Sequence, residues 1–413
     1  MRRLSLLAMS CCCLVFASAC GGSSSGSTKT LVIAVNAPFS KTPYIGTTIA
    51  NGAKLAIDEL QGSGTLPIGD KSYRFRIRRY DTGGSPAAAV RNVRRAVSDG
   101  AVAIVDEGTG VDASWSIAAD DDVPIGIVYQ GGIDLVDPQE RPNVFRIVPT
   151  DHGIAYRLAE YLLPKRPKIA ILHDDSGYGE EGAKALAAAF SGADDAVTTR
   201  ITLPSGATDL APQLLAARRS GANAVIVWAQ APVIAKALIA ARSAGWDVPF
   251  YTPPAGADPI VRQELADHPE WIDGLTFASG RMTAEEGTAP YYTFEGKYRQ
   301  AFGLERVGVK TRTGNVVIQP PEHAMYAYDF VNVLAAAIQA AGDPTDRAKV
   351  LAQMEEVTVR GANGDERAFN EKNHEGVVDD DVYFARFHDM TFAPVEDDPL
   401  SSTLPTVSQI EPD

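Results

Sequence analysis

Apolar runs of strand length alternate with segments of helical spacing along most of this chain, and this alternation limits the fold more than any other feature. Residues 31–35 form a continuous apolar run, which is typical of a strand buried on both faces. Residues 51–60 follow with apolar side chains at helical spacing, and residues 73–78 alternate apolar and charged side chains. Alternating strand and helix units predict mostly parallel sheets with helices on both faces, which is an α/β fold.

The alternation starts afresh near residue 168, so we expect two such sheets in two lobes. The expected strands are 31–35, 73–78, 102–105, 124–128, 168–172, 224–228, 249–251, 275–278 and 382–387. The expected helices are 51–60, 86–98, 114–120, 182–190, 210–220, 232–244, 290–302, 324–341 and 347–356. Residues 396–413 are acidic and contain proline, which predicts a flexible tail.

The N-terminus has the composition of an export signal. Arg2 and Arg3 precede an apolar run from residue 4 to 16, and small residues follow up to Cys20. We expect residues 1–19 to be removed and residues 20–28 to form a Gly/Ser tether. The segment resembles a bacterial lipobox, in which Cys20 would become the first residue and carry lipid, although Ala17 stands where lipoboxes usually have leucine. The alternative is ordinary cleavage after Ala19.

Cysteine content and charge exclude several classes of function. The four cysteines are Cys11, Cys12, Cys13 and Cys20, so cleavage would leave a domain with no disulfide and no thiol nucleophile. The formal net charge is −14, and removing the two leader arginines makes it −16. Such a charge argues against nucleic-acid binding and against adhesion to an anionic membrane except through lipid.

Motifs for catalysis, nucleotides and metals are weak or missing. Residues 108–113 fit GxGxxA but follow a third strand and lack the acid expected about 20 residues later. Residues 174–179 look like the start of a calcium loop, yet Ala185 stands where the twelfth ligand should be an acid. None of the six histidines pairs at metal-ligand spacing. We therefore expect no cofactor, no metal and no enzymatic activity.

Four segments in order carry a family resemblance: residues 37–60, 144–151, 169–182 and 326–342. With them the chain resembles, from about residue 30 to 395, the periplasmic binding proteins of the branched-chain amino-acid (Leu/Ile/Val) type. These are the substrate receptors of ABC importers.

The resemblance implies a type I fold of two lobes that close over a ligand like a hinge, and a monomer. It places residues 29–149 and 278–357 in an N-lobe, and residues 150–277 and 358–395 in a C-lobe. The expected crossings lie near 146–151, 275–280 and 357–361.

Site residues follow from the same resemblance, at the carboxyl ends of strands where α/β folds bind ligands. Thr109, followed by Gly110, aligns with a serine that holds the ligand carboxylate. Tyr129, Gln130 and Gly131 align with the second binding loop, where the family's threonine is lost; a shift of one residue would exchange them with their neighbours.

In the C-lobe, Tyr178 aligns with an aromatic residue that covers the ligand, although it could instead cap the lobe interface. Gln230 is a further candidate, and Trp228 either joins the pocket or points into the core. The family's acid for the ligand ammonium falls near Pro254, where no acid stands, and Asp258 is off register. A closed cleft that leaves one charge of a zwitterion unpaired loses several kcal/mol. We therefore expect a ligand other than plain leucine: a carboxylate, an aromatic acid, an amide or a larger amino acid.

The resemblance as a whole predicts an extracytoplasmic solute-binding receptor, anchored to the bacterial cell membrane by lipid, that hands a small ligand to ABC permease subunits. The alternative is a sensor of the same fold that serves a signalling partner. An enzyme on this fold is disfavoured because no nucleophile and base pair is evident in the sequence.

Overall fold

The computed structural model describes residues 28–62, 64–193, 195–279, 290–377, 382–403 and 409–411. The expected leader and Cys20 lie outside these ranges. None of the helices within them is both long and apolar enough to cross a membrane.

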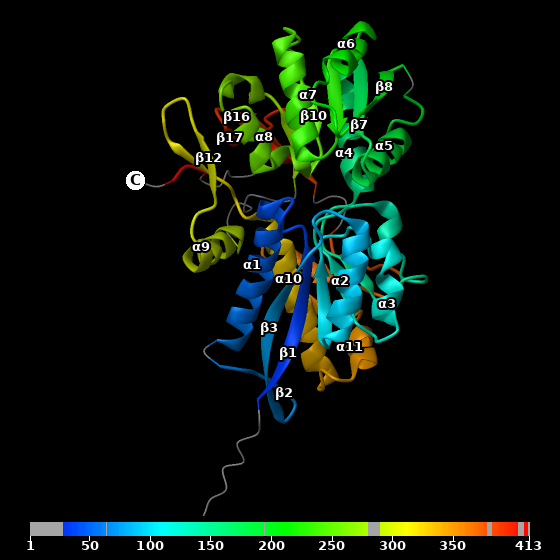
Figure 1. The fold of residues 1–413 in the computed structure, drawn as a ribbon, viewed down its shortest axis with the longest axis vertical. Helices are drawn as coiled ribbons and strands as arrows, with labels where there is room; N and C mark the ends of the chain where they lie inside the picture. The colour runs from blue at the N-terminus through cyan, green and yellow to red at the C-terminus, as the bar shows by residue number, and fades with distance from the viewer. Residues whose placement is uncertain are drawn as a thin grey trace, which may run out of the picture.

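The N-lobe is built on a six-stranded sheet in the lower half of Figure 1, in the order β2-β3-β1-β4-β5-β6. All neighbours are parallel except β2 and β3. Its strands are β1 (Lys29–Ala37), β2 (Leu66–Ile68), β3 (Lys71–Asp81), β4 (Ala101–Asp106), β5 (Ile125–Ile127) and β6 (Val144–Arg146).

Helices cover both faces of this sheet. Helices α1, α10 and α11 share one hydrophobic core with it, α9 packs on α1, and α2 and α3 share a second core on the opposite face. These helices are α1 (Pro43–Gln61), α2 (Pro86–Ser98), α3 (Trp115–Ala119), α9 (Pro290–Phe302), α10 (Glu322–Ala341) and α11 (Arg347–Met354). Helices α1 and α10 approach closely, because a Cβ added at Gly52 would lie 2.0 Å from the Ala324 carbonyl oxygen.

The C-lobe is built on a seven-stranded sheet in the order β17-β16-β11-β10-β9-β7-β8. Strands β7 to β11 pair in parallel, whereas β16 and β17 add antiparallel pairs at one edge. Its strands are β7 (Ile169–Asp174), β8 (Val197–Leu203), β9 (Ala224–Trp228), β10 (Phe250–Thr252), β11 (Thr276–Ser279), β16 (Tyr383–His388) and β17 (Thr391–Pro394).

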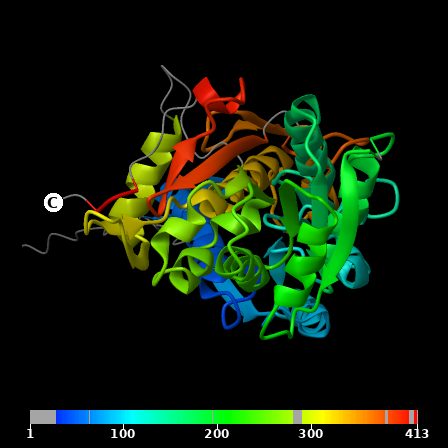
Figure 2. The ribbon, with the colours of Figure 1, turned by 90° about the horizontal axis from the view of Figure 1, so that it is seen from above.

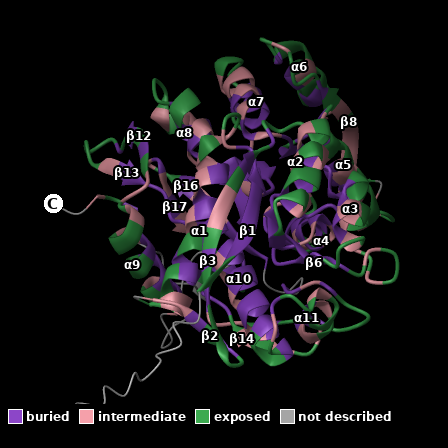
Figure 3. Ribbon diagram, turned by 60° about the horizontal axis from the view of Figure 1, so that its bottom comes forward, coloured by how far each residue is buried: buried purple, intermediate pink, exposed green. Residues whose placement is uncertain are grey.

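The C-lobe sheet is also covered on both faces: α4 and α5 share one core with it, and α6, α7 and α8 share the other. These helices are α4 (Asp151–Leu162), α5 (Gly177–Ala189), α6 (Ala211–Arg219), α7 (Ala231–Ser243) and α8 (Pro259–Glu264). In Figure 3 the buried strands lie inside and the exposed surfaces lie on the outer faces of the helices. The expected α/β fold of two lobes is therefore confirmed.

Local sequence explains these elements. Every residue of β9 is buried, as a continuous apolar run predicts, and β3 alternates between buried and exposed side chains along much of its length. Helix α2 begins at Pro86, and the Ser85 hydroxyl accepts the backbone N–H of Ala88.

Residues 358–377, which we expected in the C-lobe, belong to the N-lobe. They contain β14 (Thr358–Arg360) and β15 (Glu366–Ala368), which pack against α10. A fully buried ion pair explains the placement: Arg367 Nε lies 2.9 Å from Asp329 Oδ2 on α10. The last crossing therefore does not fall near 357–361.

A hairpin inside the range that we assigned to the N-lobe packs on the C-lobe instead. It consists of β12 (Arg306–Lys310) and β13 (Val316–Ile318), and its valines join the C-lobe core beside α8. Ile410 bridges to Val317, so residues 409–411 lie beside this hairpin (Figure 2).

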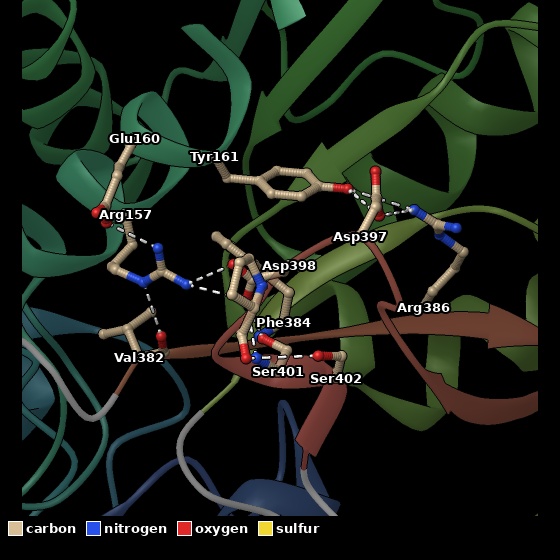
Figure 4. A network of polar contacts seen from close by, with 11 residues as sticks. Arg157, Glu160, Tyr161, Val382, Phe384, Arg386, Asp397, Asp398, Ser401 and Ser402 are labelled. Carbon is tan, nitrogen blue, oxygen red and sulfur yellow. Dashed lines mark hydrogen bonds and ion pairs between the residues drawn. The ribbon is translucent and has the colours of Figure 1, made fainter. Parts of the chain in front are cut away.

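The described part of the acidic tail is tied to the C-lobe, which corrects the expectation of a flexible segment. Arg157 Nη2 donates to both oxygens of Asp398, at 3.1 and 3.0 Å, and Tyr161 Oη donates to Asp397 at 3.0 Å (Figure 4). Lys165 and Arg386 also face Asp397. Asp397 and Asp398 therefore pair with cations that lie far from them in the sequence. The sequence alone did not indicate these partners.

Candidate functional site

A cavity, partly open to solvent, lies between the two lobes. From the N-lobe it is lined by Tyr129, Gly131, Glu322, His323 and Tyr326. From the C-lobe the lining includes Asp151, Tyr178 and Pro254, and residues 148–149 of the first crossing lie between them. A cavity that both lobes and a crossing share is a site that hinge motion would open and close.

Two of the three residues expected from the second N-lobe loop face this cavity. Tyr129 packs edge-on against His323, with ring centroids 5.0 Å apart. Gly131 lies against Asp151: the Asp151 backbone N–H donates to the Gly131 carbonyl at 2.8 Å, and a Cβ at Gly131 would lie 2.5 Å from Asp151 Oδ1. Only glycine therefore fits at this position beside the acid.

Gln130 and Thr109 are brought together, but they face each other and are not among the cavity-lining residues. Gln130 Nε2 donates to Thr109 Oγ1 at 2.7 Å and to Glu107 Oε2 at 3.1 Å. Gly110 follows with a φ of 73°, in the left-handed region that favours glycine, and packs against the carbonyl of Pro86. Gln130 thus joins the two binding loops, and ligand contact by Thr109, Gly110 or Gln130 stays a prediction.

In the C-lobe only one of the three expected side chains reaches the cavity. Tyr178 lines it from α5, whose first turn is capped by the Ser176 hydroxyl. Trp228 is 0% exposed and packs over Gly182, so it is a core residue. Gln230 begins α7, and its backbone N–H donates to Asp174 Oδ2 at 2.7 Å. Its side chain is not part of the cavity lining.

Pro254 and Asp258 lie where the ammonium partner was sought. Pro254 lines the cavity without a charge. Asp258 instead caps α8, accepting the Ile260 N–H at 2.9 Å, and burial raises the pKa of its carboxyl. Pro254 therefore brings no charge to the cavity, and Asp258 is not among the described residues that line it.

The sequence analysis missed the two acids that do line the cavity, Asp151 and Glu322. Asp151 is the first residue of α4, after the capping residue Thr150, and is 3% exposed. Burial raises the pKa of its carboxyl to about 7, and Arg146 opposes this shift. Its position in the hinge segment 144–151 was a signal that an acid would lie at the lobe boundary.

Glu322 and His323 open α10, one turn ahead of Tyr326. His323 is buried, and desolvation lowers the pKa of its imidazole to about 4, so the ring is neutral at physiological pH. The close packing of α1 on α10 near Gly52 fixes this turn against the cavity. The resemblance covered the helix from residue 326 onward and so stopped short of both residues.

The first crossing is held by a buried ion pair. Arg146 is 1% exposed; its Nε donates to Glu375 Oε2 at 2.7 Å and its Nη1 to the Gly132 carbonyl at 2.6 Å. The Arg146 backbone also pairs with His374 and Gly376. The end of β6, where the first crossing begins, is thereby joined to residues 374–376.

Comparison with known proteins agrees with this architecture. Residues 31–397 match the model of the family described as periplasmic binding protein. This chain belongs to the periplasmic binding protein family. Membership implies an extracytoplasmic location, and the resemblance drawn from the sequence is confirmed. No group of three or more His, Cys, Asp or Glu that could hold a metal occurs among the residues described above.

Individual relatives are distant but extensive. The chain is 24% identical to "Leu/Ile/Val-binding protein homolog 3" of Brucella melitensis over 337 residues, which is 80% of this chain and 84% of the relative. Two solved structures share the type I fold. A periplasmic binding protein type 1 of Bordetella pertussis has a TM-score of 0.77 at 21% identity, covering 89% of this chain and all of the other. The LivJ protein of Streptococcus pneumoniae, solved with isoleucine, has a TM-score of 0.73 at 21% identity, covering 88% of this chain and 98% of the other.

Proposed function

We propose that this protein is an extracytoplasmic receptor that captures a small amino-acid-like ligand between its lobes and delivers it to an ABC permease. The cavity shared by Tyr129, Tyr178 and the first crossing carries this proposal, because a ligand there would contact both lobes at once. A ligand that binds the closed form more tightly than the open form shifts the equilibrium toward the closed form by that difference in binding free energy.

The ligand class follows from the lining and from the relatives. Tyrosine rings and a few convergent polar groups are typical of a small-molecule site. The Brucella relative is named for leucine, isoleucine and valine, and the LivJ structure contains isoleucine. Because Pro254 replaces the family's acid and Tyr129 adds bulk in the second loop, we propose a ligand other than plain leucine.

Attachment to the membrane through lipid on Cys20 belongs to the same proposal. The leader pattern and the Gly/Ser tether after Cys20 support it. Mass spectrometry of the membrane fraction tests it: an N-terminal Cys20 whose thiol carries a diacylglyceryl group is expected, and a mature N-terminus with no lipid on Cys20 contradicts it.

Thermal melting of the purified protein, refolded to remove carried-over ligand, tests the receptor function. The panel holds aliphatic and aromatic amino acids, amides, amines and short carboxylates. A ligand at 100 times its Kd adds about 2.7 kcal/mol to the unfolding free energy, and the melting temperature rises by at least a few degrees. Micromolar binding of leucine would contradict the altered specificity, and silence across the panel would contradict the receptor function.

A further inference from the structure

Among the described residues that line the cavity, acids outnumber bases. Asp151 and Glu322 line it, whereas the described lining contains no lysine or arginine. The neutral His323 ring adds no positive charge at physiological pH. The hydroxyl of Tyr129 also experiences the charges of Glu107 and Asp258, which are acids as well. A buried site with this bias attracts cations and repels carboxylates.

Asp151 is a buried acid whose carboxylate faces the cavity. It is 3% exposed and faces the cavity, yet within the described residues no hydrogen bond reaches its carboxylate. Two charged groups act on it: Arg146 on β6 and Glu181 on α5. Arg146 is already engaged by Glu375 and by the Gly132 carbonyl, and Glu181 repels. A buried carboxylate without a partner is costly, and a ligand cation would remove that cost.

The rest of the wall suits a cation. Tyr129, Tyr178 and Tyr326 line the same cavity, and aromatic faces attract ammonium groups. By contrast, the oxygen of Thr109, which aligns with the family's carboxylate donor, accepts the Gln130 amide and is outside the lining. The described cavity therefore holds a counter-ion for an ammonium group and no cationic side chain for a carboxylate.

We propose that the cavity takes an ammonium compound that carries no balancing carboxylate, with its nitrogen against Asp151 and between the tyrosine rings. This inference rests on the proposed receptor function and narrows its ligand class. It reverses the expectation that the ammonium half of the site is lost, because the acid has moved from the C-lobe loop at Pro254 to the start of α4.

Isothermal titration calorimetry of the refolded protein with matched probes tests this assignment. Isoamylamine, L-leucinamide, L-leucine and isocaproate share one 3-methylbutyl chain, and phenethylamine and 3-phenylpropanoate form an aromatic pair. We expect the amine of at least one pair to bind at least about tenfold more tightly than its carboxylate partner. Asp151→Asn should weaken amine binding by at least about tenfold. The control Asp247→Asn, at an acid whose side chain is 93% exposed, should change it by less than about twofold.

The outcomes separate this inference from the receptor function. Carboxylates that bind as tightly as their matched amines, or amine binding that survives Asp151→Asn, would overturn the cation assignment and leave the receptor function standing. Failure of every amine overturns the cation assignment as well. If the broader melting panel is also silent, the receptor function falls with it.

Discussion

The Asp151 backbone N–H donates to the Gly131 carbonyl at 2.8 Å, which joins the loop after β5 of the N-lobe to the first helix of the C-lobe. The Asp151 side chain then lies beside Gly131, where a Cβ would come within 2.5 Å of Oδ1. This contact couples the loop, the crossing and the acid of the cavity. Any side chain at Gly131 must displace one of them.

Gly131→Ala should therefore reduce ligand affinity by at least about tenfold and lower the unfolding free energy by about 1–3 kcal/mol, because the added methyl overlaps Asp151 and the Pro149 carbonyl. Calorimetry and denaturant unfolding measure the two effects. Gly132→Ala is the matched control, since its Cβ would meet only the Leu135 side chain at 3.3 Å. Equal loss in both variants would contradict the role given to the Gly131 contact.

The stability of the ligand-free protein should fall as pH rises from about 5 to 8. Burial raises the pKa of Asp151 to about 7 in the folded state, above its value in the unfolded chain. The folded state therefore holds the extra proton in this window and loses that advantage as pH passes 7. Asp106, also raised to about 7 by burial and by Glu107, acts in the same direction.

Asp151→Asn should accordingly be more stable than the wild-type protein at pH 8, by about 1–3 kcal/mol, and show a shallower pH dependence. Urea unfolding at pH 5, 6, 7 and 8 measures both. A variant that is less stable at pH 8, or whose pH dependence equals that of the wild type, would show that Asp151 has a partner in the folded state.

The ion pair at the first crossing should matter more than pairs on the surface. Glu375→Gln leaves the buried Arg146 guanidinium without its carboxylate, and we expect a loss of about 2–4 kcal/mol, less than a fully buried pair because Glu375 is partly exposed. Glu371→Gln, at a neighbouring acid in an exposed pair with Lys372, should stay within about 0.5 kcal/mol. Urea unfolding measures the loss of unfolding free energy in both variants. Similar losses would contradict a special contribution of the Arg146–Glu375 pair to stability.

Asp398 should hold the end of the chain to the C-lobe. It accepts two hydrogen bonds from Arg157 and one from the Ser401 N–H at 3.1 Å, so Asp398→Asn is expected to cost about 1–3 kcal/mol and expose the segment to proteases. Glu396→Gln, at an exposed acid two residues earlier, serves as control. In limited proteolysis we expect faster cleavage of Asp398→Asn than of the wild type or Glu396→Gln. Equal cleavage rates for the three proteins would contradict this anchoring role of Asp398.

Sequence reasoning succeeded where local chemistry decides the outcome. The apolar run at 224–228 became a fully buried strand, and the helix predicted over residues 86–98 begins at Pro86. Prediction from the sequence failed where a contact between residues far apart in the chain determines the structure. Nothing in the sequence near Arg367 indicates that its ion-pair partner is Asp329, 38 positions earlier. That ion pair holds residues 358–377 against the N-lobe.

The same distinction applies to the site. Tyr129, Gly131 and Tyr178 line the cavity because loops after strands end at the lobe boundary, and their contact with a ligand stays a prediction. Gln130 turned to Glu107 and Thr109, and side-chain direction within a loop depends on such partners. Asp151 and Glu322 were not predicted as site residues because each begins a helix. An acid is common at that position, since it interacts favourably with the helix dipole.

The central claim is that a ligand between Tyr129 and Tyr178 closes the lobes. Small-angle X-ray scattering, with and without the tightest ligand from the melting panel, tests it most directly. We predict a smaller radius of gyration with ligand for the wild-type protein and no change for Tyr178→Ala at the same ligand concentration. A ligand that binds tightly while the radius of gyration stays the same, or that compacts Tyr178→Ala equally, would contradict capture by hinge closure.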